Sequence, residues 1–378
     1  MNRRLLQTIL LTTVCLSHVV AVHGAEADAD AQRTAIAVEA LSRIEGDINT
    51  NPALKNAVTR LLGKTRGTPA FVQIVKKFEI KDQNDGLLEV ALKNPADETG
   101  VEAIRLLLAN NGSELIKKSL ESSDSAVALK TAEVLGNTTD RQAAALLLPL
   151  VTDAKRDVAL RKQAVRGLAR TAEGAGDLLK LVKDDKLPDD LKFVTGSELN
   201  AARWPEIKAE AFKLLPPPTG PNSEAYPPVA ELLKLKGDAA NGLKIIHREA
   251  SACLNCHRIA DEGKDIGPAL TEIGTKLGRD ALMEAVLDPS AGISFGFETH
   301  SIELKSGDEA YGLIVSETAE DLSVKELTGV VKKIKKSDIA SRKQLKTSIM
   351  PTGLQATMTP QEFADLIEYL STLKKSGN

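Results

Sequence analysis

Aromatic residues are scarce in this chain of 378 residues: it has one tryptophan, three tyrosines and seven phenylalanines, together 3% of the sequence. β-Sandwiches usually draw on aromatic and β-branched residues, whereas alanine, leucine and lysine, which are abundant here, favour helices. The composition therefore predicts a mostly α-helical fold and disfavours a large β-sandwich. At about 150 residues per domain, the length predicts two or three domains.

An excess of either charge is also missing. The sequence has 49 lysines and arginines against 52 aspartates and glutamates, a formal net charge of −3. Proteins that bind nucleic acids usually carry a basic surplus, so we expect no nucleic-acid partner. Hydrophobic residues at 42% and charged residues at 27% are ordinary for a globular protein, and they disfavour disorder over the whole chain.

Long apolar runs are absent except at the N-terminus. Residues 1–24 combine a basic start, an apolar run and small residues at the end, which is the pattern of a secretory signal peptide cleaved near Gly24. A single membrane anchor is the alternative, because the run approaches spanning length, but the acidic residues that follow favour cleavage. No second run is long enough to cross a bilayer. We therefore expect a mature chain without a membrane span, in the periplasm or otherwise exported, and without Cys15.

Short amphipathic helices separated by polar breakers are predicted from about residue 31 to residue 215. Three predicted helix ends have similar sequences: Leu108-Ala109-Asn110, Leu135-Gly136-Asn137 and Leu168-Ala169-Arg170. They are about 27 and 33 residues apart, which is typical of stacked helical pairs. We therefore expect an α-solenoid that resembles HEAT repeats over residues 31–215. The alternative is an irregular helical bundle, whose alanine- and leucine-rich helices look similar.

A proline-rich segment ends this region. Pro216-Pro217-Pro218 and Pro227-Pro228 cannot continue a helix, so residues 216–234 are predicted to form an extended linker. Residues 235–375 then form a second domain, which begins with a helix predicted from Asp238 to Glu249.

The strongest chemical motif follows this helix. Cys253, Cys256 and His257 form the pattern C-x-x-C-H, which is the attachment signature of c-type haem. Two thiols at this spacing can add to the two vinyl groups of the porphyrin, and the next residue supplies an imidazole to the iron. The motif predicts one covalently bound haem c per chain, with His257 as an axial ligand.

Three other kinds of site are weaker interpretations of the same residues. A structural zinc site needs four ligands, and the mature chain has no further cysteine and only His247 and His300 as further histidines. A thioredoxin-like dithiol is expected after a strand in a βαβ unit, whereas a helix precedes this pair. A disulfide between the two cysteines would close too short a loop to stabilise the fold much.

Further short motifs occur in order around this site, over about 140 residues. They are Gly237-Asp238-Ala239-Ala240-Asn241-Gly242, Gly267-Pro268-Ala269-Leu270, Leu287-Asp288-Pro289-Ser290, Ser348-Ile349-Met350-Pro351-Thr352-Gly353-Leu354 and a final helix from Pro360 to Leu373. Together they resemble a family of haem-binding c-type cytochrome domains, in which a small β insertion separates the C-x-x-C-H segment from the distal methionine. The resemblance implies a cytochrome c-like helical domain. One departure is Ile246-His247, where a bulky apolar or aromatic pair usually closes the first helix.

The resemblance also implies roles for residues around the haem. His257 is the proximal ligand, and its other ring nitrogen is expected to donate to the carbonyl oxygen of Pro268, as in the broader cytochrome c family. Met350, 93 residues after His257, is the distal ligand. A thioether favours ferrous iron and raises the reduction potential relative to a second imidazole.

Four other residues are alternative axial ligands. Met358 lies at the start of the final helix, and Met283 lies within an amphipathic helix, where a core position is expected. His247 lies ten residues before His257, and His300 opens a predicted strand; either one would give a bis-histidine centre. For His247 three roles remain open: facing the haem edge, pairing with a propionate, or a surface position.

The pattern changes to alternation between about residues 297 and 339. It predicts four antiparallel strands as a β insertion, which is a small barrel in one interpretation: Glu298 to Lys305, Ala310 to Ser316, Leu322 to Leu327 and Val330 to Ile334. Lysines cluster near its end: Lys332, Lys333, Lys335 and Lys336. A solvated face is the ordinary explanation for such a cluster. The alternative is an electrostatic docking surface for an acidic redox partner.

Together these features predict an exported monohaem c-type cytochrome, which transfers single electrons between protein partners and is not itself an enzyme. An iron with six ligands, including histidine and methionine, has no open position for peroxide or oxygen. Two alternatives stay open: the electron-accepting subunit of a separate dehydrogenase complex, and a haem-based peroxidase or sensor. The solenoid would supply a surface for protein recognition.

Overall fold

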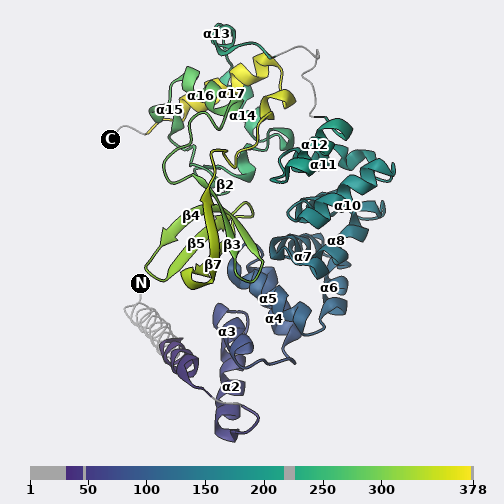
Figure 1. Ribbon diagram of the computed structural model, residues 1–378, viewed down its shortest axis with the longest axis vertical. Helices are drawn as coiled ribbons and strands as arrows, with labels where there is room; N and C mark the ends of the chain where they lie inside the picture. Colours follow the sequence, from purple (N-terminus) through teal and green to yellow (C-terminus); the bar gives the residue numbers. More distant parts are fainter. Residues whose placement is uncertain (1–30, 46–47, 217–225, 376–378) are drawn as a thin grey trace, which may run out of the picture. The chain divides into compact units, whose positions relative to one another are not determined.

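A computed structural model describes residues 31–45, 48–216 and 226–375. Helices dominate the described residues and a small antiparallel sheet accompanies them (Figure 1), so the predicted mostly α-helical class is confirmed at this level. The predicted signal peptide, residues 1–24, lies outside the described residues. The chain divides into two compact units, residues 1–93 with 102–116 and residues 94–101 with 117–378. This division falls within the helical region and not at the proline-rich segment.

In the part that the structure describes, the first unit is built of short helices. Residues 31–43 are helical, and the next elements are α2 (Pro52–Thr65), α3 (Pro69–Lys77), α4 (Asn84–Lys93), α5 (Glu98–Ala109) and α6 (Ser113–Leu120), of which α5 and α6 each continue across the division. Asn51 caps α2 by accepting a hydrogen bond from the N–H of Leu54. Prolines at the first positions of α2 and α3 have no N–H that needs an acceptor, which suits a helix start.

Six further helices open the second unit: α7 (Ser125–Thr138), α8 (Arg141–Thr152), α9 (Val158–Leu168), α10 (Ala172–Lys183), α11 (Asp189–Asn200) and α12 (Pro205–Leu214). Helices pack against the next helix in the chain and the next but one: α7 contacts α8 and α9, and α9 contacts α11. α7 and α9 come especially close, because a Cβ at Gly136 would lie 2.6 Å from the Cα of Gly167. The three helix ends predicted from the sequence lie within a few residues of the ends of α5, α7 and α9.

Part of the segment predicted as an extended linker is packed. The short helix α13 (Val229–Leu232) lies within it, and Leu232 is buried in the core of the helices that follow. The ring of Tyr226 packs edge-on against that of Phe363, with the ring centroids 5.7 Å apart. Apolar side chains around Pro227 and Pro228 therefore fix residues 226–234 to the C-terminal helices.

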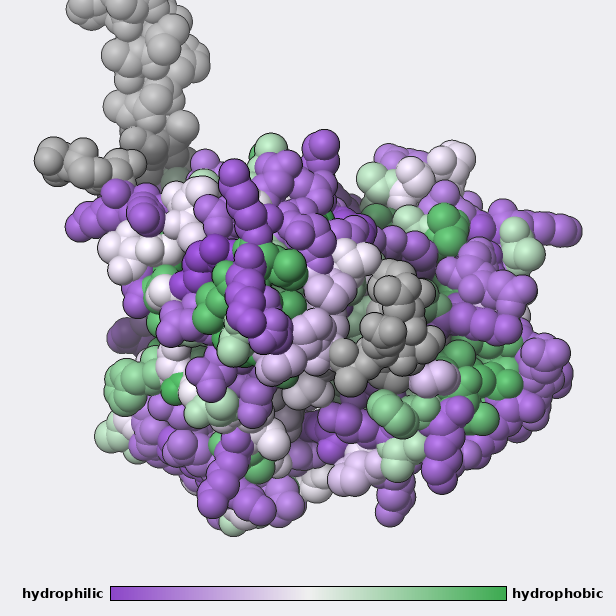
Figure 2. Space-filling view, turned by 90° about the horizontal axis from the view of Figure 1, so that it is seen from above, coloured by the Kyte–Doolittle hydropathy of each residue, from purple (hydrophilic) through white to green (hydrophobic). Residues whose placement is uncertain are grey.

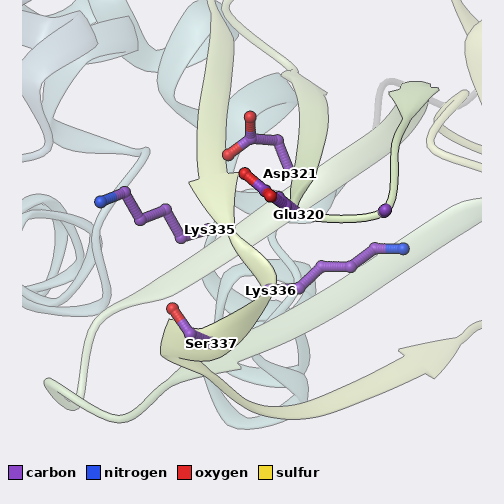
Figure 3. A pocket seen from close by; sticks show the side chains of 6 residues that line it. Glu320, Asp321, Lys335, Lys336 and Ser337 are labelled. Atoms are coloured by element: carbon purple, nitrogen blue, oxygen red, sulfur yellow. The ribbon is translucent and has the colours of Figure 1, made fainter.

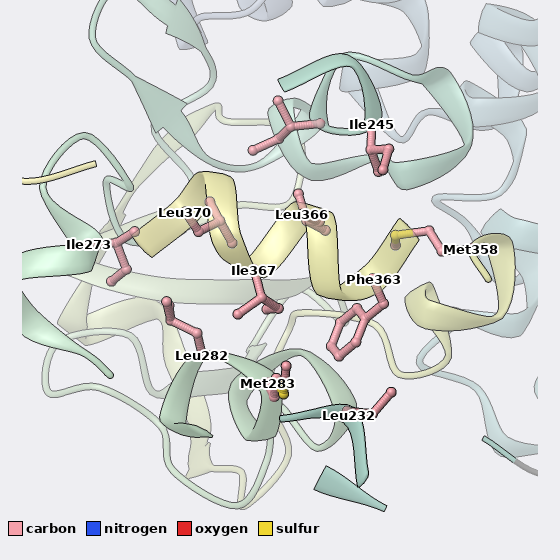
Figure 4. Close-up of a cluster of buried hydrophobic side chains, with 11 residues drawn as sticks. Leu232, Ile245, Ile273, Leu282, Met283, Met358, Phe363, Leu366, Ile367 and Leu370 are labelled. Carbon is pink, nitrogen blue, oxygen red and sulfur yellow. The ribbon is translucent and has the colours of Figure 1, made fainter. Parts of the chain in front are cut away.

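The C-terminal helices are α14 (Ala239–Ile246), α15 (Ile273–Lys276), α16 (Arg279–Leu287) and α17 (Pro360–Thr372). α17 lies between α14 and α16, surrounded by a cluster of buried apolar side chains (Figure 4). α17 agrees with the predicted final helix, whereas α14 ends at Ile246, earlier than predicted. α14 and α17 approach closely because Gly242 has no side chain: a Cβ there would collide with the carbonyl oxygen of Asp365.

The β insertion has five strands, not the four predicted. They are β3 (Thr299–Leu304), β4 (Glu309–Glu317), β5 (Asp321–Glu326), β6 (Val331–Lys335) and β7 (Ile339–Gln344), and they pair antiparallel in the order β6-β5-β4-β3-β7. β6 and β7 are the two edges, so the sheet is open and the barrel interpretation is wrong. β7 extends the insertion beyond residue 339. After Ile339 and Ala340 its residues are polar, and all but Ile339 are exposed, so the sequence shows no alternation there.

Hydrophilic side chains predominate on the face drawn in Figure 2, where hydrophobic ones form separate areas. Scattered hydrophobic residues of this kind are ordinary on a protein surface. None of the described helices is both long enough and apolar enough to cross a membrane.

Candidate functional site

The C-x-x-C-H segment forms a tight turn after α14. A short 3-10 helix, η1 (Glu249–Ser251), precedes the segment, and a second, η2 (Cys253–Asn255), lies within it. The carbonyl oxygen of Cys253 accepts hydrogen bonds from the N–H groups of Cys256 (3.2 Å) and His257 (2.9 Å). This turn places both thiols and the imidazole on one short, fixed stretch of backbone.

The chain then returns to this turn through a hairpin of β1 (Arg258–Ile259) and β2 (Glu262–Gly263). After the hairpin, the N–H groups of Ile266 (2.9 Å) and Gly267 (2.7 Å) both donate to the carbonyl oxygen of Cys256. These hydrogen bonds hold residues 264–268, the 264–268 loop, against the C-x-x-C-H turn. The loop thereby brings Pro268 next to the imidazole.

His257 is oriented by this loop. Its Nδ1 lies 2.7 Å from the carbonyl oxygen of Pro268, which is the contact that the cytochrome resemblance implies. Gly267 faces the ring: a Cβ there would lie 2.7 Å from Cε1 and 2.9 Å from Nδ1 of His257. A larger residue would therefore push the ring away from the carbonyl oxygen. The sequence shows a glycine before the proline, but it does not indicate this contact.

Burial favours the neutral form of His257. It lowers the pKa of the imidazole, and the hydrogen bond to Pro268 opposes this effect only in part. A carbonyl oxygen can only accept, so we assign the proton of the neutral ring to Nδ1. Nε2 then has a free lone pair, and it forms no hydrogen bond within the described part of the chain. A neutral imidazole in this tautomer is a suitable metal ligand.

Cys253 and Cys256 are free thiols and are half-buried. Burial raises the pKa of both, and that of Cys256 reaches about 11 with a further contribution from the negative charge of Glu198. Reactive dithiols depend on a lowered thiol pKa. This environment therefore disfavours a thioredoxin-like redox pair.

The donor set fits a covalently bound haem. Two free thiols precede a neutral imidazole whose Nε2 is available, and iron in a haem needs only this one nitrogen on the proximal side. A zinc ion would instead need four protein ligands around one point. Within residues 31–45, 48–216 and 226–375, no three histidine, cysteine, aspartate or glutamate side chains converge in this way.

Met350 differs from the other methionines of the described residues. It lies half-buried in the loop after β7, where its N–H donates to Oγ of Ser348 (3.1 Å). Met283 and Met358 are 0% and 1% exposed and lie in the hydrophobic core around α17 (Figure 4). The core position expected for Met283 is thus confirmed. The structure brings Cys253, Cys256, His257 and Pro268 together. No hydrogen bond between described residues connects Met350 to these four.

Both further histidines have partners of their own. Nδ1 of His247 lies 2.8 Å from the carbonyl oxygen of Leu243, and Nε2 lies 2.7 Å from a carboxylate oxygen of Glu262. The carbonyl oxygen and then the carboxylate raise the pKa of His247, whose side chain is exposed. His300 is 8% exposed in β3, and its Nδ1 lies 3.0 Å from the carbonyl oxygen of Glu298.

The lysines of the predicted docking surface do not share one face of the sheet. In β6, Lys332 is in register with the buried Val324 and so lies on the side of the sheet's core. Lys333 and Lys335 alternate with it and lie on the other side. Lys333 and Lys335 therefore share one side of β6, and Lys332 lies on the opposite side.

Acidic residues accompany several of these lysines. Lys333 pairs with Asp321 (2.9 Å), and Lys336 pairs with Glu317 (2.8 Å). Figure 3 shows Lys335 and Lys336 extending in opposite directions beside Asp321. The local positive field is consequently weaker than the sequence alone indicates.

A scan against protein-family models finds no match to this chain, and a search of curated protein sequences finds no significant relative. The cytochrome resemblance thus depends on the motifs of residues 235–375. The geometry of the C-x-x-C-H turn is compatible with it.

Proposed function

We propose that this protein is an exported monohaem c-type cytochrome that transfers single electrons between protein partners. The observation that supports this most directly is the hydrogen bond between Nδ1 of His257 and the carbonyl oxygen of Pro268, beside two free thiols at C-x-x-C spacing. This bond orients the imidazole and leaves Nε2 for the iron.

Each residue of the turn has a separate role in the proposal. Cys253 and Cys256 hold the porphyrin through two thioether bonds, and His257 binds its iron. When bound, the haem supplies a one-electron couple between ferric and ferrous iron. Gly267 gives the imidazole room, and Pro268 accepts from its N–H, which makes the ring a stronger donor to the metal.

Met350 is proposed as the second axial ligand. Its side chain lies outside the core that holds Met283 and Met358, so binding to a haem would not require that core to unpack. A sixth ligand leaves no open position for peroxide or oxygen. This coordination therefore favours electron transfer over a peroxidase or a sensor.

The helices before residue 215 are proposed to form a HEAT-like α-solenoid that recognises protein partners. Within α7–α12, contacts of α7 with α8 and α9 and of α9 with α10 and α11 support this interpretation. An acidic redox partner is proposed to dock near Lys333 and Lys335. Cleavage near Gly24 would export the mature chain.

Expression together with a haem-attachment system tests the proposal. We expect the purified chain to keep a haem stain on a denaturing gel and to give a low-spin spectrum with a sulfur-to-iron band. In Met350→Ala the band disappears but the stain remains, whereas Met358→Leu, a conservative change in the core, keeps both. A native high-spin iron that binds added ligands would contradict electron transfer and support catalysis or sensing.

A further inference from the structure

A lysine of the sheet contacts the 264–268 loop. Nζ of Lys325, in β5, donates to the carbonyl oxygen of Asp265 (2.7 Å) and also to its carboxylate Oδ2 (3.0 Å). The Lys325 side chain is only 18% exposed, although that of Asp265 is 66% exposed. The ammonium group is therefore sheltered and held by two oxygens of one residue, 60 positions earlier in the chain.

The turn between β5 and β6 makes a second contact with the same loop. Ile266 is 2% exposed, and a Cβ at Gly329 in the turn would lie 3.8 Å from its Cγ1. Thr328 and Val330, on either side of Gly329, are 4% and 3% exposed, so the turn itself is packed. The sheet therefore holds both residues that precede Gly267.

We propose that Lys325 is a positioning residue for the His257–Pro268 hydrogen bond. The connection is short: Lys325 holds Asp265, and Pro268 follows only three residues later with the carbonyl oxygen that orients His257. The β insertion thus helps to hold the imidazole of His257 in position. This proposal rests on the proposed function where it concerns the haem.

A change in this support alters the ligand in a defined direction. A hydrogen bond from the second nitrogen makes a ligating imidazole more basic, and a more basic ligand stabilises ferric iron. When the loop loosens, the bond weakens and ferric iron is stabilised less. Loss of the Lys325 contact should therefore raise the reduction potential.

Lys325→Met in the full mature chain tests the proposal, with Lys333→Met as the matched control. Lys333 lies in the neighbouring strand and forms an ion pair of similar length, but with Asp321 within the sheet. Amide hydrogen exchange at Ile266 and Gly267 should become about tenfold faster in Lys325→Met, because local opening becomes easier. It should stay at the wild-type rate in Lys333→Met.

The reduction potential of the haem-loaded chain gives the second measurement. It should rise in Lys325→Met, stay unchanged in Lys333→Met, and return toward wild type in Lys325→Arg, which keeps the charge and the donors. Equal exchange in Lys325→Met and Lys333→Met overturns the proposal, and so does faster exchange without a change in potential. Exchange needs no haem, so a chain that never acquires haem contradicts the proposed function, while exchange still shows whether Lys325 holds the loop.

Discussion

Asp365 joins two helices through one buried carboxylate. It is 4% exposed and accepts hydrogen bonds of 2.8 Å from the N–H of Asp238 and the side chains of Asn241 and Gln361. Burial raises its pKa, but the hydrogen bonds from Asn241, Asp238 and Gln361 lower the pKa more. Asp365 is therefore ionised at neutral pH and anchors the start of α14 to α17.

Asp365→Asn should lower the free energy of unfolding by about 1–3 kcal/mol at pH 7, because an amide offers fewer acceptors to the three donors that contact this buried side chain. The lowered pKa means that ionised Asp365 stabilises the fold above the ordinary carboxyl pKa. This contribution is lost as the pH falls through the folded-state pKa. Urea unfolding should thus show a difference between variant and wild type that shrinks below about pH 4. A difference that is constant with pH contradicts this account; Asp261→Asn, at an exposed carboxylate, is the control.

The turn of the motif could be predicted from the sequence, and the Pro268 contact from the resemblance, whereas the contacts of Gly267 and Lys325 could not. C-x-x-C-H identifies Cys253, Cys256 and His257 because adjacent residues must share one turn. The contact of Gly267 with the ring depends on how the 264–268 loop folds back. Lys325 depends on a contact over 60 positions, which a local pattern cannot contain.

At the scale of elements, the packing of α14 against α17 depends on one glycine. A Cβ at Gly242 would meet the backbone of Asp365 and would lie 2.7 Å from Cβ of Tyr369. Both helices must then separate, because a helix backbone cannot yield locally without losing hydrogen bonds. α14 leads directly into the C-x-x-C-H turn, so this packing also places the candidate site.

Gly242→Ala should destabilise the protein by about 1–3 kcal/mol through overpacking. Gly176→Ala is the matched control, because Gly176 lies in α10 and a Cβ there would meet no atom within 4 Å. There alanine should stabilise by about 0.5–1 kcal/mol through its higher helix propensity. Thermal unfolding of both variants measures the difference. A Gly242→Ala protein as stable as wild type would show that the two helices are not closely packed.

Helices and strands could be predicted where buried and exposed residues recur with a regular period along the chain. α17 has a buried face and a capping box at Thr359, and β5 alternates buried and partly exposed residues. β7 has neither a buried face nor alternation, so only its pairing with β3 identifies it. α13 is four residues long, which is too short for a periodic pattern.

At the scale of the whole molecule, charge position matters more than net charge. The formal net charge is only −3, but Lys333 and Lys335 lie on one side of β6 and Lys332 lies on the other. A local positive area can raise the encounter rate with an acidic partner even in an acidic protein. Because side chains alternate along a strand, lysines that are adjacent in the sequence lie on two faces of the sheet. The sequence alone could not show which lysine lies on which face.

Lys335→Gln should slow electron transfer with an acidic redox protein at low ionic strength, and the effect should fade as salt screens the charge. Lys332→Gln, in the same strand but on the other side, should have a smaller effect. Neutralising Lys332, Lys333, Lys335 and Lys336 together should slow transfer most. Stopped-flow rates across ionic strength measure these differences. Rates in all variants that equal wild type at low salt would rule out docking at β6.

Covalent attachment of haem to Cys253 and Cys256 is the central claim, and one peptide tests it most directly. Trypsin cleaves after Arg248 and Arg258, so residues 249–258 carry both cysteines and His257. After expression with a haem-attachment system, mass spectrometry should find this peptide with the added mass of one haem. The added mass should be absent when both cysteines are replaced by alanine. An unmodified peptide from the wild-type chain would contradict the account.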